Sequence, residues 1–403
     1  MKRPIPFIAG VALLVILPLL LSAGLLNAAI QMLIAALFAS AYGLLAGRAG
    51  MLSFGHAAYF GVGAFATVHA MNAFDGAGLL PTPLLPLVGA VAGLAFSVVA
   101  GWFATKRSGT AFAMITLAIA ELLHALAPQL KGWFGGESGI STMRMPAWGI
   151  SFGSTTQVYY LTLAWVLLSL ALLYFHTLSP AGRLTLALRE NSHRLRFLGY
   201  NVHGLGVSAF AISGLFSGLA GALQVLSNES ANYVVFDAGV SAAVVLNSYI
   251  GGVGVFLGPA LGAALMTFFG YAASDATQAW LLYQGVIFVL VMMFMPQGLA
   301  GAFAQPRRMT ARLGWHLLAW LVAALLLATG VVMAVELLQR LCSQDYRALR
   351  QAGAAWPAVQ MLGRDWAPGA AGTWALTLLP LIAGSTLLVF VRSMQSTTAK
   401  EPA

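Results

Sequence analysis

Charged residues are scarce in this chain, where they make up 8% of 403 residues while hydrophobic residues make up 60%. Soluble domains carry about 25% charged residues, so this composition excludes an ordinary soluble protein. Cysteine is almost absent, since Cys342 is the only one in the sequence. A single cysteine excludes a disulfide framework within the chain and a cysteine-rich metal site.

The common signatures of catalysis are also missing. The sequence has no G-x-x-x-x-G-K-[ST] phosphate loop, no H-E-x-x-H and no G-x-S-x-G. The stretch 61–66 fits the loose dinucleotide pattern, but it lies inside an apolar segment with no strand before it. We therefore expect a protein that is not an enzyme, holds no metal and binds no cofactor of its own.

Apolar segments of about 20 residues, the length that crosses a bilayer, recur along the whole chain. The first resembles a signal peptide, but a second apolar segment follows at once, so we expect an uncleaved first span. The sequence predicts an all-α, polytopic transmembrane helix bundle, with roughly ten spanning or broken helices followed by two more. The spans are expected near 5–26, 28–46, 55–73, 80–104, 109–130, 157–175, 205–226, 238–257, 259–273, 278–298, 314–338 and 374–392.

Basic residues gather on alternate connections between these segments, so the net charge of +9 does not indicate nucleic acid. Lys and Arg accumulate on the cytoplasmic side of membrane proteins. This rule predicts a multi-pass protein of the bilayer with a cytoplasmic N-terminus. The residues expected on the inner side are Lys2, Arg3, Arg48, Lys106, Arg107, the arginines of 183–196, Arg307, Arg308, Arg312, Arg392 and Lys400.

The densest charge cluster lies in the polar interval 179–202, SPAGRLTLALRENSHRLRFLGYNV, between two apolar segments. Leucines at helical spacing alternate there with arginines, and Gly199 is placed to end the helix. A basic amphipathic segment between two spans lies in water. It is therefore expected to dock a soluble partner.

Two glycine-rich stretches, 43–65 and 247–264, interrupt the apolar pattern, one in each half of the chain. Irregular backbone at membrane depth persists only where it is buried in protein or lines a cavity, so the pair predicts helix breaks along a translocation path. The predicted break residues are Gly50, Gly55, Gly251, Gly252 and Gly254. The alternative is close helix packing, as for Gly214 with Gly218 and Gly258 with Gly262.

A few polar residues fall inside apolar segments, and each has a functional and a structural interpretation. Those placed on the translocation path are Ser53, His56, Glu121, Asn247 and Ser248. The structural alternatives are helix capping for the first and last pairs, and a helix-to-helix pair for Glu121 with His124. Glu336, near a span end, is expected at the membrane interface.

Several of these stretches together resemble the permease of the branched-chain amino acid ATP-binding-cassette importers. They are 47–65, 110–121, 135–140, 179–202, 210–223 and 249–263, spaced in family order over about residues 25–303. The resemblance implies an inner-membrane subunit that pairs with a second homologous permease, two cytoplasmic ATPase subunits and a periplasmic solute-binding protein. It also implies that ATP is used by the ATPase partner, and that 179–202 is the ATPase-coupling segment, with Gly182, Arg183, Arg189, Glu190 and Gly199 as its carried-over positions.

The sequence departs from the family pattern in three places. Ser192 stands where many relatives have a second acid, and Phe134 precedes Gly135 where threonine is common. Residues from about 310 onward add two spans and a polar outer loop. We therefore expect two domains, a permease domain over 1–305 and a C-terminal extension over 306–403.

The function expected from these observations is translocation of branched-chain amino acids or a similar small polar solute, such as urea or an amide. A secondary transporter with Glu121 as its ion-coupling residue is the alternative, although such a protein normally has more intramembrane acids. A membrane-embedded enzyme would show paired acids or a nucleophile with its base, and the sequence shows neither.

Overall fold

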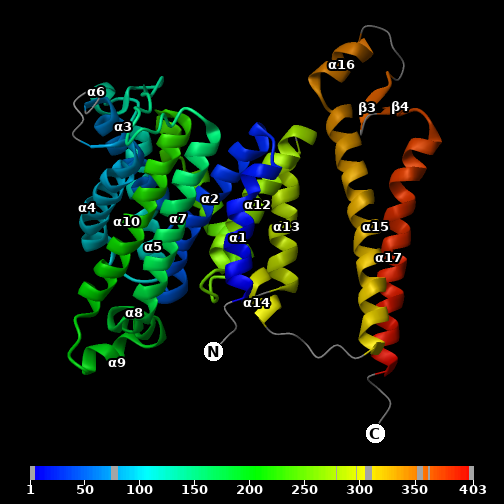
Figure 1. Cartoon of the computed structure of the whole chain (residues 1–403). Coiled ribbons are helices and arrows are strands. Elements are labelled where there is room, and N and C mark those ends of the chain that lie inside the picture. Colours follow the sequence, from blue (N-terminus) through cyan, green and yellow to red (C-terminus); the bar gives the residue numbers. More distant parts are fainter. Residues whose placement is uncertain are drawn as a thin grey trace. The chain divides into compact units, whose positions relative to one another are not determined.

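The computed structural model describes residues 5–73, 80–277, 279–295, 297–304, 311–351, 357–361 and 364–398, and it confirms the all-α polytopic fold (Figure 1). The predicted inner-side residues Lys2, Arg3, Arg307, Arg308 and Lys400 lie outside the described residues, as does the predicted domain boundary at 305/306. The longer helices of the first part of the chain are α1 (Ile5–Leu20), α2 (Ala23–Gly43), α3 (His56–Ala73), α4 (Pro86–Ala104), α5 (Thr110–Leu126), α7 (Thr155–Leu178), α8 (Pro180–Glu190), α10 (Val202–Asn228), α11 (Ala238–Gly251), α12 (Gly258–Ala276) and α13 (Trp280–Phe294).

Short elements connect these helices. A π-helix, η1 (Leu44–Ala49), continues α2, and 3₁₀ turns form η2 (Thr82–Leu84) and η3 (Tyr233–Phe236). Short α-helices form α6 (Lys131–Phe134), α9 (Ser192–Phe197) and α14 (Gly298–Ala304). Two-residue strands β1 (Ile140–Ser141) and β2 (Ser230–Ala231) pair antiparallel, which fastens the loop after α6 to the end of α10.

The chain divides into two compact units. Unit 1 contains residues 1–272 and 284–304, and unit 2 contains residues 273–283 and 305–403. Unit 1 therefore holds both glycine-rich stretches and the whole interval 179–202.

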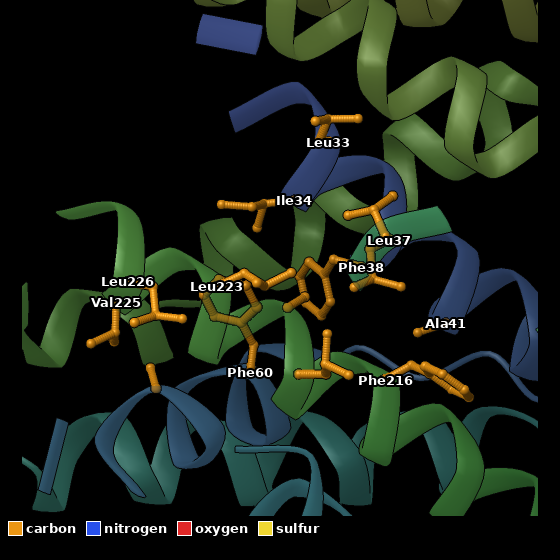
Figure 2. Close-up of a cluster of buried hydrophobic side chains, with 14 of the residues drawn as sticks. Leu33, Ile34, Leu37, Phe38, Ala41, Phe60, Phe216, Leu223, Val225 and Leu226 are labelled. Atoms are coloured by element: carbon orange, nitrogen blue, oxygen red, sulfur yellow. The ribbon is translucent and has the colours of Figure 1, made fainter. Parts of the chain in front are cut away.

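The core of unit 1 is built around α2 and α10. Within the most apolar window of each of these helices, 83% of the residues are buried, against 44% for the η2–α4 segment and 39% for α7. Both α2 and α10 are apolar on nearly every side, which suits a helix surrounded by other helices. Figure 2 shows this core, where Leu37 and Phe38 of α2, Phe60 of α3 and Leu223 of α10 lie among the buried side chains.

Glycine lets α4 and α10 approach closely. A Cβ atom at Gly218 would lie 2.3 Å from the carbonyl oxygen of Gly89, and one at Gly214 would lie 2.2 Å from the Ser97 side chain. A Cβ atom at Gly262 would likewise lie 2.2 Å from the Asn247 carbonyl oxygen. The packing interpretation of the Gly214–Gly218 and Gly258–Gly262 pairs is therefore confirmed.

Six helical segments within the described residues are long and apolar enough to cross a membrane. They are Ala23–Ala49, Thr82–Ala104, Thr155–Leu178, Val202–Asn228, Trp280–Gly301 and Leu325–Cys342, and shorter apolar helices accompany them. Several predicted boundaries were wrong. The first predicted span, 5–26, crosses the gap between α1 and α2, where Ser22 adopts an extended conformation, and the predicted span 238–257 runs past the end of α11 at Gly251.

Unit 2 consists mainly of two long antiparallel helices, α15 (Ala311–Leu341) and α17 (Ala371–Thr398), which pack against each other (Figure 1). Between them lie α16 (Gln344–Gln351) and the hairpin of β3 (Val359–Met361) with β4 (Arg364–Trp366). The interfacial position of Glu336 stays a prediction, and its side chain is buried, with 5% of the residue exposed. Its carboxylate accepts a hydrogen bond from the Tyr283 hydroxyl at 3.1 Å and lies 3.6 Å from Arg340 Nε.

Candidate functional site

The interval 179–202 folds into α8 and α9, which lie at one end of unit 1, opposite α6 (Figure 1). A polar side chain begins each helix. Ser179 Oγ accepts the amide of Gly182 at 3.2 Å, Asn191 Oδ1 accepts that of Arg194 at 2.9 Å, and Asn201 Oδ1 accepts that of Gly204 at 3.0 Å at the start of α10. These are N-caps, which satisfy amides that a helix leaves free. The sequence therefore divides the interval into two short helices instead of the single helix that we expected.

One face of α8 and α9 forms a groove with a cavity volume of about 500 Å³. Arg183 and Glu190 of α8 line it, together with Arg194 of α9. Leu198, which lines the groove, is 66% exposed, and Phe197, its neighbour in the sequence, is 93% exposed. The groove thus combines both signs of charge with uncovered apolar surface. The full set of lining residues is Pro180, Arg183, Leu184, Ala187, Glu190, Asn191, Arg194, Leu195, Leu198 and Tyr200.

The other face of α8 and α9 lines a larger recess of about 870 Å³. Its walls come from the end of η1, the loop between α4 and α5, the first turns of α5, and the start of α10. Its charged lining residues are Lys106, Arg107, Arg189 and Arg196, so the recess is basic.

The carried-over positions of 179–202 fall in different places. Arg183 and Glu190 line the groove, whereas Arg189 lies on the recess side and donates from Nη1 to the Gly47 carbonyl oxygen at 2.5 Å. Gly182 is buried in the first turn of α8, and Gly199 follows α9 with φ of +86°. Their roles toward an ATPase stay predictions.

The five predicted break residues lie at or next to helix ends. Gly50 follows η1 with φ of +70°, and Gly55 precedes α3. Gly251 is the last residue of α11, Gly252 follows it with φ of +101°, and Gly254 lies in the turn before α12. Each glycine-rich stretch therefore contains an interruption of helical structure.

The first predicted polar pair is enclosed in the core. Ser53 and His56 are at most 1% exposed, and Ser53 Oγ lies 3.0 Å from His56 Nδ1. The other imidazole nitrogen, Nε2, lies 2.9 Å from Ser213 Oγ of α10, and Ser213 in turn donates to the Ala41 carbonyl oxygen of α2 at 2.7 Å. A chain of hydrogen bonds therefore joins α3, α10 and α2.

Aromatic rings surround this imidazole. Tyr42 and Tyr59 contact it edge-on, with centroid separations of 5.0 and 5.7 Å, and Phe210 lies at 6.2 Å. Our sequence analysis missed Ser213 and both tyrosines. The usable signal for Ser213 was a hydroxyl inside the apolar stretch 210–223, but nothing in the sequence connects it with a histidine 157 positions away.

The second pair is also buried, whereas Glu121 is not. Asn247 is 7% and Ser248 0% exposed, and Ser248 Oγ donates to the Ala39 carbonyl oxygen of α2 at 3.5 Å. Glu121 is exposed on α5, and the ring of His124, one turn further along, contacts that of Tyr233 with centroids 5.6 Å apart. Ser213, the partner of His56, and Ser248 therefore donate to carbonyl oxygens within one turn of α2, whereas Glu121 lies on the surface of unit 1. A path through these residues stays a prediction.

Within the described residues, no group of three or more His, Cys, Asp or Glu side chains lies together in a way that could hold a metal ion. The hollows on these helices are the groove on α8 and α9 and the basic recess, and Gly50 at the first glycine-rich break lines the recess.

Comparison with known proteins identifies the relatives of this arrangement. Residues 24–296 match the family described as branched-chain amino acid transport system / permease component. The chain is similar to the high-affinity branched-chain amino acid transport system permease protein LivM of Salmonella typhimurium, with 27% identity over 323 residues that cover 74% of this chain and 75% of the relative. It is 26% identical to LivM of Escherichia coli over 322 residues, with the same coverage. No solved structure matches the chain.

Proposed function

Because the chain belongs to the family of branched-chain amino acid transport permease components, we propose that it is the membrane permease subunit of an ATP-binding-cassette importer. The solute is a branched-chain amino acid or a similar small polar molecule, in keeping with the names of the LivM relatives. The membrane is the inner membrane of a bacterium. Family members are transport subunits, so ATP hydrolysis belongs to a separate ATPase subunit.

The observation that carries this proposal is the surface of α8 and α9. A soluble partner needs a water-exposed surface with apolar anchors and charges, and this segment presents Phe197 and Leu198 beside a groove with Arg183 and Glu190. Burying such anchors against a docked subunit removes apolar surface from water, at about 25 cal/mol per Å². We therefore assign the groove to the ATPase subunit.

This assignment fixes the rest of the assembly. Since the ATPase is cytoplasmic, the α8–α9 end of unit 1 faces the cytoplasm. This orientation agrees with the sequence prediction that Arg48, Lys106 and Arg107 lie on the inner side. The opposite end, with α6 and the paired strands β1 and β2, then faces a periplasmic solute-binding protein. A second, homologous permease completes the translocation path.

Transport proceeds by alternating access. Closure of the ATPase subunits on ATP displaces α8 and α9, and the helices pivot at the breaks near Gly50 and Gly252. The hydrogen-bonded core of His56 with Ser53 and Ser213 keeps α2, α3 and α10 together during that movement. No covalent chemistry on the solute is required.

Co-purification in a mild detergent tests the proposal. The tagged chain is expected to retain an ATPase subunit and a second permease, and Arg183→Ala and Glu190→Ala are each expected to reduce the retained ATPase and the ATP-driven solute uptake at least tenfold. Arg196→Ala is the matched control, because Arg196 belongs to the same segment but lines the recess instead of the groove. Normal ATPase retention in both groove variants would contradict the docking assignment.

A further inference from the structure

Arg189 is a charged residue of α8 that points away from the proposed docking groove. It is absent from the groove lining, which includes Ala187 and Glu190, and it lines the recess together with Leu188. Its Nη1 atom donates a hydrogen bond of 2.5 Å to the carbonyl oxygen of Gly47, which lies 142 residues earlier in η1. Arg189 thus connects α8 with the first glycine-rich break.

The Gly47 carbonyl is open to this contact because η1 is not an α-helix. In an α-helix the amide of Met51 would donate to the Gly47 carbonyl. In η1 the Met51 amide instead donates to the Leu45 carbonyl at 3.2 Å, and the Gly50 amide donates to the same Leu45 oxygen. The π-helical turn therefore leaves the Gly47 oxygen for the guanidinium group, which gives a charge-assisted hydrogen bond.

The stem of Arg189 is held as well as its head. A Cβ atom at Gly50 would lie 2.8 Å from Arg189 Cγ and 3.2 Å from its Cβ, so only glycine leaves room for the side chain there. Gly50 also has φ of +70°, a conformation that residues other than glycine rarely adopt. Gly47 and Gly50 together form a seat for Arg189 at the end of η1.

The same turn of η1 lies against the second break. A Cβ atom at Gly47 would lie 2.2 Å from the carbonyl oxygen of Val253, in the turn between α11 and α12. Gly252, one residue before Val253, packs against Gly298 at the start of α14. A Cβ atom at Gly298 would lie 2.4 Å from the Gly252 backbone. A displacement of η1 therefore moves the backbone at both breaks, because no glycine side chain lies between the contacting backbones that could change rotamer instead.

We propose that Arg189 is the residue that transmits movement of α8 to both glycine-rich breaks, and that it does not contact the ATPase. This inference rests on the proposed function, because it requires an ATPase that moves α8. Arg189 is a positioning residue: it acts through Gly47 and touches no solute. Its role is separable from that of Arg183, which lines the groove on the opposite face of the same helix.

The experiment compares Arg189→Ala, Arg189→Lys, Arg183→Ala and Arg196→Ala in the complete complex, purified and reconstituted into lipid vesicles. Three quantities are measured: the ATPase retained by the tagged permease, solute uptake, and ATP hydrolysed per solute carried. Arg196 lines the same recess as Arg189, so Arg196→Ala controls for the loss of one positive charge there.

Arg189→Ala is expected to retain the ATPase within twofold of the wild type, to reduce uptake at least tenfold, and to raise the ATP hydrolysed per solute. Arg189→Lys keeps the charge and the ability to donate a hydrogen bond but loses the planar guanidinium, so intermediate uptake with full ATPase retention is expected. Arg183→Ala should lose the ATPase itself. If Arg189→Ala is not recovered from the membrane, the lysine variant alone decides.

Two results would overturn the inference while leaving the proposed function intact. Loss of the ATPase from both Arg189 variants would make Arg189 a docking contact, and uptake within twofold of the wild type would remove any role in transmission. If the wild-type chain itself retains no ATPase, the proposed function fails, and the inference fails with it.

Discussion

His56 Nε2 lies 2.9 Å from Ser213 Oγ, and the two residues come from helices whose sequence positions differ by 157. Both side chains are buried, and Ser213 passes the interaction on to the Ala41 carbonyl of α2. A buried polar group costs free energy unless it is hydrogen-bonded. This contact therefore fixes how α2, α3 and α10, the central helices of unit 1, are rotated relative to one another.

We expect Ser213→Ala to destabilise the protein by about 1–3 kcal/mol, since it leaves one imidazole nitrogen of His56 and the Ala41 carbonyl without this partner. The temperature at which half of the detergent-purified protein loses its monodisperse elution peak should fall by several degrees. Ser217→Ala is the control, because Ser217 is equally buried on α10 but donates only to the Ser213 carbonyl of its own helix, at 2.8 Å. Equal effects of the two variants would show that the link between helices adds nothing.

Local signals in the sequence predicted part of the candidate site. Gly199 follows the end of α9 as predicted, because a helix end depends on residues within one turn. The caps Ser179, Asn191 and Asn201 were not predicted, and the interval was expected to form one helix. The break between α1 and α2 at Ser22 could not be found in the same way. The residues around it are mostly apolar and Ser22 makes no side-chain capping hydrogen bond, so hydropathy does not distinguish one bent segment from one long helix.

Contacts between distant segments account for what the sequence could not predict. Arg189 had the same local pattern as Arg183, and only the fold separates them, by turning one toward Gly47 and the other toward the groove. The π-helical geometry of η1 likewise depends on packing, since Gly47 lies against Val253, more than 200 positions away. Single-sequence patterns contain periodicity and turn chemistry, but they do not contain these pairings.

The ion pair of Arg144 with Glu229 supports a second prediction. Arg144 Nε lies 3.0 Å from Glu229 Oε1, the Arg144 amide donates to the same oxygen at 3.1 Å, and Nη1 donates to the Leu226 carbonyl at 2.8 Å. Glu229 adopts a left-handed conformation at the end of α10, directly before β2. The pair therefore holds the loop that carries β1 against the end of α10.

Arg144→Ala is expected to speed proteolytic cleavage within residues 142–154 severalfold, because the loop loses the two side-chain contacts of Arg144, to Glu229 and to the Leu226 carbonyl oxygen. A double-mutant cycle with Glu229→Ala should give a coupling energy of about 0.5–1 kcal/mol, which is modest because the Glu229 side chain is 37% exposed. The coupling should shrink in high salt. Lys131→Ala, an exposed cation on α6 at the same end of unit 1, is the control and should leave the cleavage rate unchanged.

Glu121 distinguishes the importer from a secondary transporter. In an importer the energy comes from ATP on a partner subunit, so an exposed carboxylate on α5 need not bind or release an ion. We therefore expect Glu121→Gln, which keeps the size and polarity of the side chain, to retain uptake within about twofold, and Glu121→Leu to show a larger loss if this face of α5 meets the solute. Uptake is measured in vesicles that contain ATP and no ion gradient.

An ion-coupled carrier would behave in the opposite way. Its wild type would be inactive without a gradient, and Glu121→Gln would abolish gradient-driven uptake, because a protonatable or ion-binding carboxylate would have been replaced by a neutral amide. That result would show that an ion gradient acting through Glu121 of α5, and not ATP on a subunit docked at α8 and α9, drives transport.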